Sequence, residues 1–182
     1  MIVLGLDPSL RNFGFSRADL NVNTGELSDV QVFLHSTASS KHKQVRKNSD
    51  DLERCRSTHK ALKAAVDDAD MVFVEVPVGS QSARAMASYG FCIGILASIE
   101  KPVIQLTPTE IKKAATGSAN ATKQEMIEWA VGEYPGAGWL RSGKKERLIN
   151  DNEHMADATA AIKAGLESDL YKQATAVLKW AS

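Results

Sequence analysis

Residues 1–14 read MIVLGLDPSLRNFG, and the rest of the chain can be interpreted as a frame around Asp7. Residues 1–6 are apolar apart from Gly5 and rich in β-forming side chains, which predicts a strand buried on both faces and ended by the turn at Asp7-Pro8. Removing a carboxylate from water is costly unless a cation, a metal ion or hydrogen-bond donors face it. Asp7 is therefore either a turn residue before proline or the first member of a functional site, and this stretch alone favours the turn.

Length and composition predict one folded domain. The chain has 182 residues, of which 43% are hydrophobic and 24% charged, so we expect a single domain over residues 1–182. No run approaches the roughly 18 apolar residues that a membrane span needs. The N-terminus also lacks the basic and then apolar pattern of a signal peptide, so we expect a soluble, cytoplasmic protein.

Charge and cysteine content narrow the function classes. The 22 basic and 22 acidic side chains balance, so any nucleic-acid site must be a local patch rather than a property of the whole surface. Cys55 and Cys92 lie far apart in the sequence and form no CxxC pair. This spacing argues against both a disulfide framework and a zinc site.

The N-terminal half predicts an antiparallel meander followed by a helix. Residues 13–20 and 26–36 flank the sequence NVNTG, whose Asn and Gly residues supply the turn of a hairpin. The polar loop that follows is either solvated surface or a phosphate-facing patch, and its basic residues are Lys41, Lys43, Arg46 and Lys47. A helix is then expected from Asn48 or Ser49 to about Asp67, with an apolar face made of Leu52, Cys55, Leu62 and Val66.

Residues 71–76 read MVFVEV and predict a second fully buried strand, which carries one charged residue, Glu75, just before Pro77. A glutamate among five apolar neighbours is hard to explain as surface alternation, because the residues on both sides of it favour burial. Glu75 therefore places a second carboxylate at a strand end, as Asp7 does.

Residues 80–99 predict a helix with small residues on one face, namely Ala83, Ala87, Gly90, Gly94 and Ala97. A glycine inside a helix costs up to about 1 kcal/mol relative to alanine. The two glycines therefore indicate close approach of another backbone, either the chain's own sheet or a second subunit.

Residues 102–106 predict a third buried strand, followed by two short helices around the loop 117–120. Each helix begins with a capping box, TPTE at 107–110 and TKQE at 122–125. Residues 134–149 hold three glycines and a proline and predict a flexible basic loop, whose basic residues are Arg141, Lys144, Lys145 and Arg147.

The next helix is expected to be capped by Asn150 or Asp151, with an apolar side made of Met155, Thr159, Ile162 and Leu166. His154 and Asp157 lie at i and i+3 on an adjoining face whose other members are small, so this face could bring both side chains to Asp7 and Glu75. A lone HxxD is more often a capped or solvated pair than a ligand set. Residues 170–180 predict a last amphipathic helix that serves packing.

The expected order is three antiparallel strands, helix, strand, helix, strand and then helices. This is an α/β fold of the ribonuclease H-like kind, with a mixed five-stranded sheet of three antiparallel and then two parallel strands, flanked by helices. The sequence resembles the RuvC-type Holliday junction resolvases over nearly its whole length. The similar segments are GLDPSLRNFGFS, VFVEVP, EIKKAATGSANATKQEM and NEHMADATAAI.

The resemblance implies a metal-dependent endonuclease of DNA recombination and repair that acts as a homodimer on four-way junctions. It implies paired symmetric nicks with 5′-phosphate and 3′-hydroxyl ends, and two Mg²⁺ ions, or Mn²⁺ in their place, in each active site. The implied catalytic and metal-binding residues are Asp7, Glu75, His154 and Asp157, and the implied DNA contacts are Lys112 and Lys123. Val78 stands where the family often has an aromatic side chain that stacks on junction bases.

Three alternatives remain beside this interpretation. An actin-like or sugar-kinase ATPase also opens with a strand, Asp and a glycine turn, but it needs a second lobe for which 182 residues leave no room. The others are a nuclease of the same fold that acts on other branched DNA or on RNA, and a junction protein that binds without cutting. An intact four-residue metal set argues against the last of these.

Overall fold

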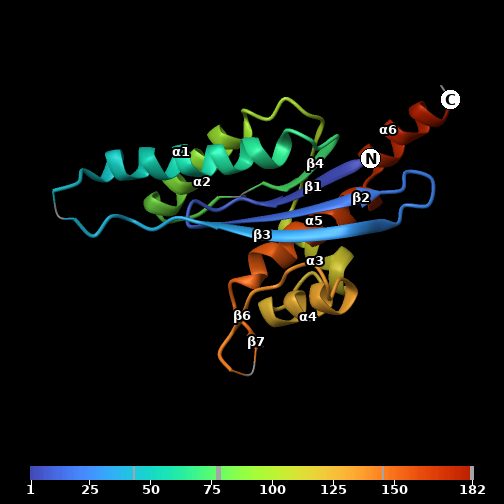
Figure 1. Cartoon of the computed structure of the whole chain (residues 1–182). Helices are drawn as coiled ribbons and strands as arrows, with labels where there is room; N and C mark the ends of the chain where they lie inside the picture. Colours follow the sequence, from blue (N-terminus) through green and yellow to red (C-terminus); the bar gives the residue numbers. More distant parts are fainter. Residues whose placement is uncertain (43, 77–78, 145, 181–182) are drawn as a thin grey trace.

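The computed structural model describes residues 1–42, 44–76, 79–144 and 146–180, and one five-stranded sheet forms its centre (Figure 1). The strands are β1 Ile2–Asp7, β2 Asn12–Leu20, β3 Leu27–Ser36, β4 Met71–Glu75 and β5 Val103–Leu106. Their spatial order is β3-β2-β1-β4-β5, in which the first two pairings are antiparallel and the last two parallel. The predicted mixed sheet is therefore confirmed.

Helices cover the two faces of the sheet (Figure 1). One face carries α1 Lys47–Val66 and α2 Ala83–Leu96, and the other carries α3 Pro108–Thr116, α4 Lys123–Glu133 and α5 Asn152–Glu167. The helix α5 packs directly on β1, β2 and β4, while α3 and α4 pack against α5. The chain ends in α6 Asp169–Trp180. In the part of the chain that the structure describes, no helix combines the length and apolar character needed to cross a membrane.

Side-chain alternation along β1 and β4 decides which face the two strand-end carboxylates occupy. Val3 belongs to the core cluster on the α5 side, whereas Leu4 and Leu6 belong to the cluster under α1. Because successive side chains on a strand point to opposite faces, Asp7 points to the α5 side. On β4, Phe73 lies in the α5-side cluster, so Glu75, two residues later, points to the same side.

The two predicted capping boxes are present as predicted. The Thr107 hydroxyl accepts from the backbone N–H of Glu110, and the Glu110 carboxylate accepts from the backbone N–H of Thr107. Thr122 and Glu125 repeat this arrangement at the start of α4. The first backbone N–H groups of a helix have no carbonyl partner within the helix, and these reciprocal bonds satisfy two of them. Both helices therefore begin where the sequence predicts.

The predicted apolar face of α1 is wrong at Leu52, which is 51% exposed, whereas Asp51 beside it is only 2% exposed. Arg84 donates two hydrogen bonds of 2.6 Å to the Asp51 carboxylate, and Arg54 lies 3.6 Å from it. A buried carboxylate is stable only when it is paired, and this pairing turns Asp51 inward and Leu52 outward. The helix also begins at Lys47, one residue before the predicted start.

The helix α2 is shorter than the predicted span 80–99, because the Ser82 side chain caps it by accepting from the N–H of Ala85. Its small-residue stripe, from Ala83 to Ala97, is exposed. A Cβ built on Gly90 or Gly94 meets nothing within 4 Å. Of the two predicted neighbours for this stripe, the chain's own sheet is therefore excluded.

The segment 134–149 is more ordered than the predicted flexible loop. It contains a two-stranded hairpin, β6 Arg141–Ser142 and β7 Arg147–Leu148, and Trp139 is buried with its ring N–H donating to the carbonyl of Tyr134. Asp151, one of the two predicted caps of α5, is the N-cap residue of this helix, but its side chain makes no capping bond. Asn152 is buried instead, and its side-chain amide pairs with the backbone of Leu140, which ties α5 to the hairpin.

Candidate active site

The candidate site begins with two carboxylates at the ends of neighbouring parallel strands. In the β1–β4 pairing, Leu6 lies opposite Val74, so Asp7 and Glu75 follow at adjacent positions at the carboxyl ends of these strands. Glu75 is the last residue of β4 and Asp7 the last of β1. Because both also point to the α5 side, they lie beneath the first turns of that helix.

Two glycines let α5 approach the sheet closely enough to add its own side chains to the site. A Cβ on Gly14, the β2 residue opposite Asp7, would overlap the backbone carbonyl of His154. A Cβ on Gly5 would overlap the carbonyl of Ala158 in the same way. The absence of side chains at these two positions therefore determines where His154 lies relative to β1.

His154 contacts Asp7 directly. Its Nδ1 lies 2.6 Å from Oδ2 of Asp7, and the two side chains are 20% and 14% exposed. Burial alone would lower the pKa of His154, but the hydrogen bond to Asp7 and the surrounding carboxylates outweigh it and raise this pKa above its usual range. The structure thus joins β1 and α5 at the predicted site.

Asp157 and Glu75 are acids in an environment that disfavours their charged forms. Burial, reinforced by the carboxylates of Asp7 and Asp157, raises the pKa of Glu75 to about 8. Burial and then the charge of Asp7 raise the pKa of Asp157 to about 7. One Asp157 oxygen, Oδ1, is buried without a hydrogen-bond partner among the described residues. The cluster of Asp7, Glu75 and Asp157 therefore has more carboxylates than nearby positive charges to neutralise them.

A bound divalent cation would supply the positive charge that this cluster lacks. Within the described ranges, no three His, Cys, Asp or Glu side chains stand in a metal-holding arrangement, and Asp7 and His154 are hydrogen-bonded to each other instead. The donor set nevertheless fits Mg²⁺ or Mn²⁺, which prefer carboxylate oxygens. A bound cation would satisfy the unpaired buried oxygen of Asp157 and would lower the raised pKa values of both acids.

Two lysines flank the acidic site. The charge of Lys112, on α3, lowers the pKa values of both Glu75 and Asp157, although burial outweighs it in each case. Lys123, the first residue of α4, lies 2.7 Å from the carboxylate of Glu153, and Asp157 and Asp7 add to the field that raises its pKa. The structure therefore brings both predicted DNA-contacting lysines to the edge of the site.

Glu153 is a member of this site that the sequence reasoning missed. It lies in the first turn of α5, its side chain is 15% exposed, and its Oε1 lies 3.5 Å from Nε2 of His154. The one feature of the sequence that could have indicated Glu153 is its position directly before His154. Since i and i+1 side chains on a helix do not face each other, that signal did not point to a shared site.

The remaining basic candidates lie on, or directly beside, two projecting segments (Figure 1). One segment is the connection from β3 to α1, and the other is the β6–β7 hairpin. The described members are all exposed, and they are Lys41, Arg46, Lys47, Arg141, Lys144 and Arg147. Lys43, Lys145 and Val78 lie outside the described residues.

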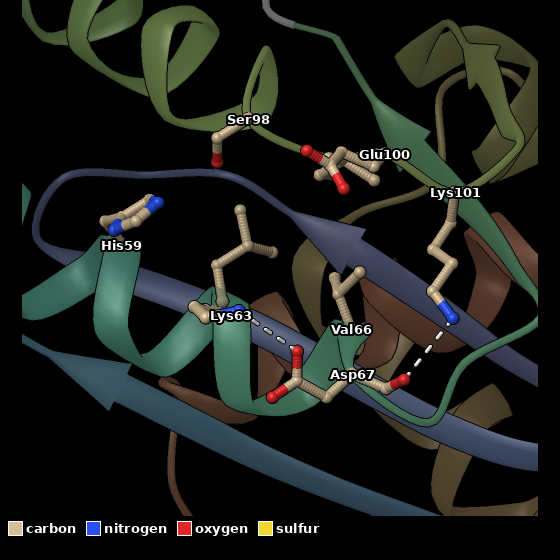
Figure 2. Close-up of a pocket in the computed structure, with 9 residues that line it drawn as sticks. His59, Lys63, Val66, Asp67, Ser98, Glu100 and Lys101 are labelled. Atoms are coloured by element: carbon tan, nitrogen blue, oxygen red, sulfur yellow. Dashed lines mark hydrogen bonds and ion pairs between the residues drawn. The ribbon is translucent and has the colours of Figure 1, made fainter.

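A separate cavity of about 310 Å³ lies at the other end of the parallel strands (Figure 2). Val66, Asp67 and Lys101 line it, and they precede β4 and β5 rather than following them. Lys63 pairs with Asp67, one turn later at the end of α1, at 3.4 Å along one wall of this cavity (Figure 2). None of the predicted site residues lines it, so it does not belong to the acidic site.

The sheet order and the acidic residues on β1, β4 and α5 define a ribonuclease H-like fold. A family model described as "Crossover junction endodeoxyribonuclease RuvC" matches residues 3–131. The chain belongs to the RuvC family. The matched range contains Asp7, Glu75, Lys112 and Lys123 but ends before α5, so the roles of His154 and Asp157 depend on the geometry described above.

Individual relatives agree with this assignment. The RuvC of Salinibacter ruber is 26% identical over 191 residues, covering 100% of this chain and 94% of that protein. The RuvC of Prochlorococcus marinus strain MIT 9211 is 27% identical over 126 residues, covering 69% and 77%. Among solved structures, Thermus thermophilus RuvC in complex with a Holliday junction substrate is similar with a TM-score of 0.62, 18% identity, and coverage of 96% of this chain and 97% of that one. This last likeness supports the fold.

Proposed function

We propose that this chain is a structure-selective endonuclease that resolves four-way DNA junctions by paired symmetric nicks, with residues 1–182 forming one nuclease domain. The observation that carries the proposal is the convergence of Asp7, Glu75 and the α5 pair His154 and Asp157 in a chain of the RuvC family. A relative of the same fold was solved with a Holliday junction substrate, which supports the same substrate class here.

The proposed cofactor is a pair of Mg²⁺ ions, for which Mn²⁺ would substitute. Asp7, Glu75, His154 and Asp157 would hold them, since these side chains lie together and three of the four supply hard oxygen donors. Bound divalent ions supply an activated water and charge stabilisation for the departing oxygen in phosphodiester hydrolysis. Excess chelator should therefore abolish cleavage, and full cleavage in its presence would contradict this cofactor.

The chain's own residues orient the site. Asp7 and His154 fix each other through their 2.6 Å contact, so β1 and α5 keep one relative position. Lys112 lies within the electrostatic influence of Glu75 and Asp157, where its ammonium would contact the phosphate that is to be cut. Burial of Glu75 and Asp157 limits competing water and strengthens these electrostatic interactions.

DNA affinity would come from local basic groups, because the net charge of the chain is zero. Lys112 and Lys123 lie at the acidic site, while the β3–α1 connection and the β6–β7 hairpin carry the outer basic residues. Lysine and arginine contacts to phosphates release counterions, so binding should weaken steeply as salt rises. We include Lys43 and Lys145 in this set on their sequence positions alone.

The proposed assembly is a homodimer formed through α2. Met86 and Ile93 on this helix are each 47% exposed, beside the small-residue stripe that has no neighbour within the described chain at Gly90 and Gly94. Small residues allow two helices to approach closely, and a two-fold dimer presents two sites to opposed strands of a junction. This exposed surface supports the proposal of paired nicks.

Three substrates test the function. Purified protein is incubated with Mg²⁺ and a four-way junction, a linear duplex or ATP, and the products are analysed. We expect nicked duplexes with 5′-phosphate and 3′-hydroxyl ends from the junction, and no comparable product from the duplex or from ATP. Flaps and branched RNA in the same assay distinguish a junction nuclease from a nuclease of other branches.

A protein that binds junctions without cutting them is the second candidate. The observation in its favour is that Asp7 and His154 hydrogen-bond to each other, and that no metal-holding group of three occurs among the described residues. Junction binding without any product in Mg²⁺ and in Mn²⁺ would establish this candidate and contradict the first.

A further inference from the structure

Glu153 connects the acidic site to Lys123, and the function proposed above gives it no task. Its Oε1 accepts a 2.7 Å hydrogen bond from the Lys123 ammonium and lies 3.5 Å from Nε2 of His154. Its Oε2 also lies 2.7 Å from the ammonium, but it has no hydrogen-bond partner among the described residues. His154 in turn contacts Asp7. A continuous chain of polar contacts therefore runs from the predicted DNA-contacting lysine to the predicted catalytic aspartate.

The two side chains of the Lys123–Glu153 ion pair differ in solvent exposure and therefore in conformational freedom. The Lys123 side chain is 79% exposed, whereas that of Glu153 is 15% exposed. A largely buried carboxylate on a packed helix is held in place, while an exposed lysine can exchange partners through its flexible stem. The carboxylate is thus the fixed partner and the ammonium the mobile one.

We propose that Glu153 is a positioning residue that competes with DNA phosphate for Lys123 and so restrains the affinity of the protein for DNA. This inference rests on the proposed function, in which Lys123 contacts phosphate. The ammonium is already ion-paired with the Glu153 carboxylate before DNA arrives, so a phosphate gains only the difference between the two ion pairs. The freed carboxylate also remains near the phosphate and repels it.

The Lys112 side chain provides the contrast within the same site. Among the described residues, no carboxylate lies within ion-pair distance of the Lys112 ammonium. Lys112 is therefore available to a phosphate from the start, whereas Lys123 is already occupied. The two lysines should consequently respond differently when Glu153 loses its charge.

The test is a double-mutant cycle measured by gel shift in Ca²⁺ with a four-way junction and a linear duplex. Glu153→Gln keeps the shape of the side chain and removes its charge, and it should bind both DNAs about two- to fivefold more tightly, the range of one solvent-exposed ion pair. The dependence of affinity on salt should steepen by up to about 0.9 in log–log slope, the value for one counterion released from a phosphate, because binding no longer frees a carboxylate that takes up a cation in return. Lys123→Ala should then cost more affinity in the Glu153→Gln background than in the parent.

Two controls separate this effect from a change in net charge or in folding. Asp67→Asn also removes one negative charge and frees one lysine, Lys63, but it lies in the cavity at the opposite end of the strands (Figure 2), so it should leave DNA affinity unchanged. Lys112→Ala should cost the same affinity in the parent and in the Glu153→Gln background. Thermal unfolding of each variant checks that the fold is intact.

The outcomes distinguish this inference from the proposed function. Equal costs of Lys123→Ala in both backgrounds, or equal effects of Glu153→Gln and Asp67→Asn, would overturn the role of Glu153 while junction cleavage by the parent stands. If the parent protein binds junctions but does not cut them, the nuclease proposal is overturned. The double-mutant cycle still tests the role of Glu153 in that case, because it measures binding alone. A parent that binds no DNA overturns both.

Discussion

Glu75 and Asp157 differ from ordinary strand-end and helix-face acids because each is buried beside another carboxylate. Burial is the larger cause of the raised pKa in both residues, and the charge of Asp7 adds to it in both. Asp7 itself faces His154, which offers it a hydrogen-bond partner. At the scale of residues, the site is therefore a group of acids around His154, whose ring nitrogens lie 2.6 Å from Asp7 and 3.5 Å from Glu153.

The raised pKa of Glu75 predicts how stability depends on pH in chelator. The folded pKa is about 8 and the usual value is 4.5, so between these pH values the folded state binds more protons and the free energy of unfolding falls as pH rises. Glu75→Gln removes this titration. The difference in stability between Glu75→Gln and the parent should therefore shift in favour of the variant by on the order of 4 kcal/mol between pH 5 and pH 9.

Urea unfolding of both proteins in EDTA at the two pH values measures this gain. Glu26→Gln is a matched control, because Glu26 is an exposed loop glutamate. Parallel pH profiles for the parent and Glu75→Gln would show that Glu75 is not held in a desolvated, acidic environment.

Replacement of the strand-end aspartate should separate cleavage from binding. Asp7→Asn keeps the shape of the side chain but loses the charge that a divalent ion requires, so we expect no nicking in Mg²⁺ and a retained gel-shift band in Ca²⁺. The pair Lys112→Ala with Lys123→Ala should weaken binding more than Asp7→Asn does, because phosphate contacts supply most of the affinity.

Circular dichroism establishes that the Asp7→Asn protein is folded before the two assays are compared. Near-normal cutting by the folded variant would show that Asp7 is only the turn residue that its Asp-Pro sequence suggests. Loss of its gel-shift band would show that cleavage and binding are not carried by separate residues.

At the scale of elements, the position of α5 on the sheet determines the site. The helix packs on β1, β2 and β4, and its backbone lies close against the sheet where Gly5 and Gly14 lack side chains. On the other face, the pair of the buried Asp51 and the partly exposed Arg84 joins α1 to α2. The first contact brings His154 to Asp7, and the second decides which side of α1 faces inward.

The close approach at Gly14 predicts a large effect of a single methyl group. Gly14→Ala would place a Cβ against the backbone of His154, so the helix must shift, at a cost of about 1 to 3 kcal/mol in stability. Because the shift moves His154 away from Asp7, nicking in Mg²⁺ should fall at least about tenfold, which corresponds to about 1.4 kcal/mol in the barrier.

Gly132→Ala on α4 is the matched control for this change. A Cβ at Gly132 meets nothing within 4 Å, and alanine favours a helix over glycine, so this variant should gain up to about 1 kcal/mol. Denaturant unfolding compares the two variants with the parent. Similar stabilities for Gly14→Ala and the parent would mean that α5 is not held against β2 as described.

At the scale of the whole molecule, a chain with no net charge needs locally concentrated basic residues to bind DNA. Its 22 basic and 22 acidic side chains cancel overall, yet acids gather at the strand ends while basic residues flank them and occupy the projecting segments. The exposed stripe on α2 lies on the opposite side of the sheet from α5 (Figure 1). A dimer formed through α2 would therefore leave the acidic site of each subunit uncovered.

The proposed dimer predicts the effect of a bulky residue on α2. Gly94→Leu would fill the surface where a second helix must approach, so sizing chromatography should show more monomer, and the two nicks in a junction should lose their simultaneity. Leucine favours a helix over glycine, so the fold should be retained. Unchanged sizing together with unchanged paired cleavage would show that the dimer uses another surface.

Several parts of this protein could be predicted from the sequence because their causes are local. The strands around Asp7 and Glu75 follow from apolar runs of strand length, and the starts of α3 and α4 follow from capping boxes of four residues. The resemblance to RuvC resolvases also predicted a role for Asp7, Glu75, His154 and Asp157, which stays a prediction. Local patterns of this kind act over a few bonds and do not depend on the rest of the fold.

Only the tertiary structure decided features that depend on partners distant in sequence. Leu52 matched a helical stripe, but Asp51 is buried in its place because Arg84 approaches from another helix. Glu153 pairs with Lys123 only because α4 and α5 pack together. A charged side chain is buried or exposed according to whether a counter-charge reaches it, and that is set by the packing of elements rather than by neighbours in the chain.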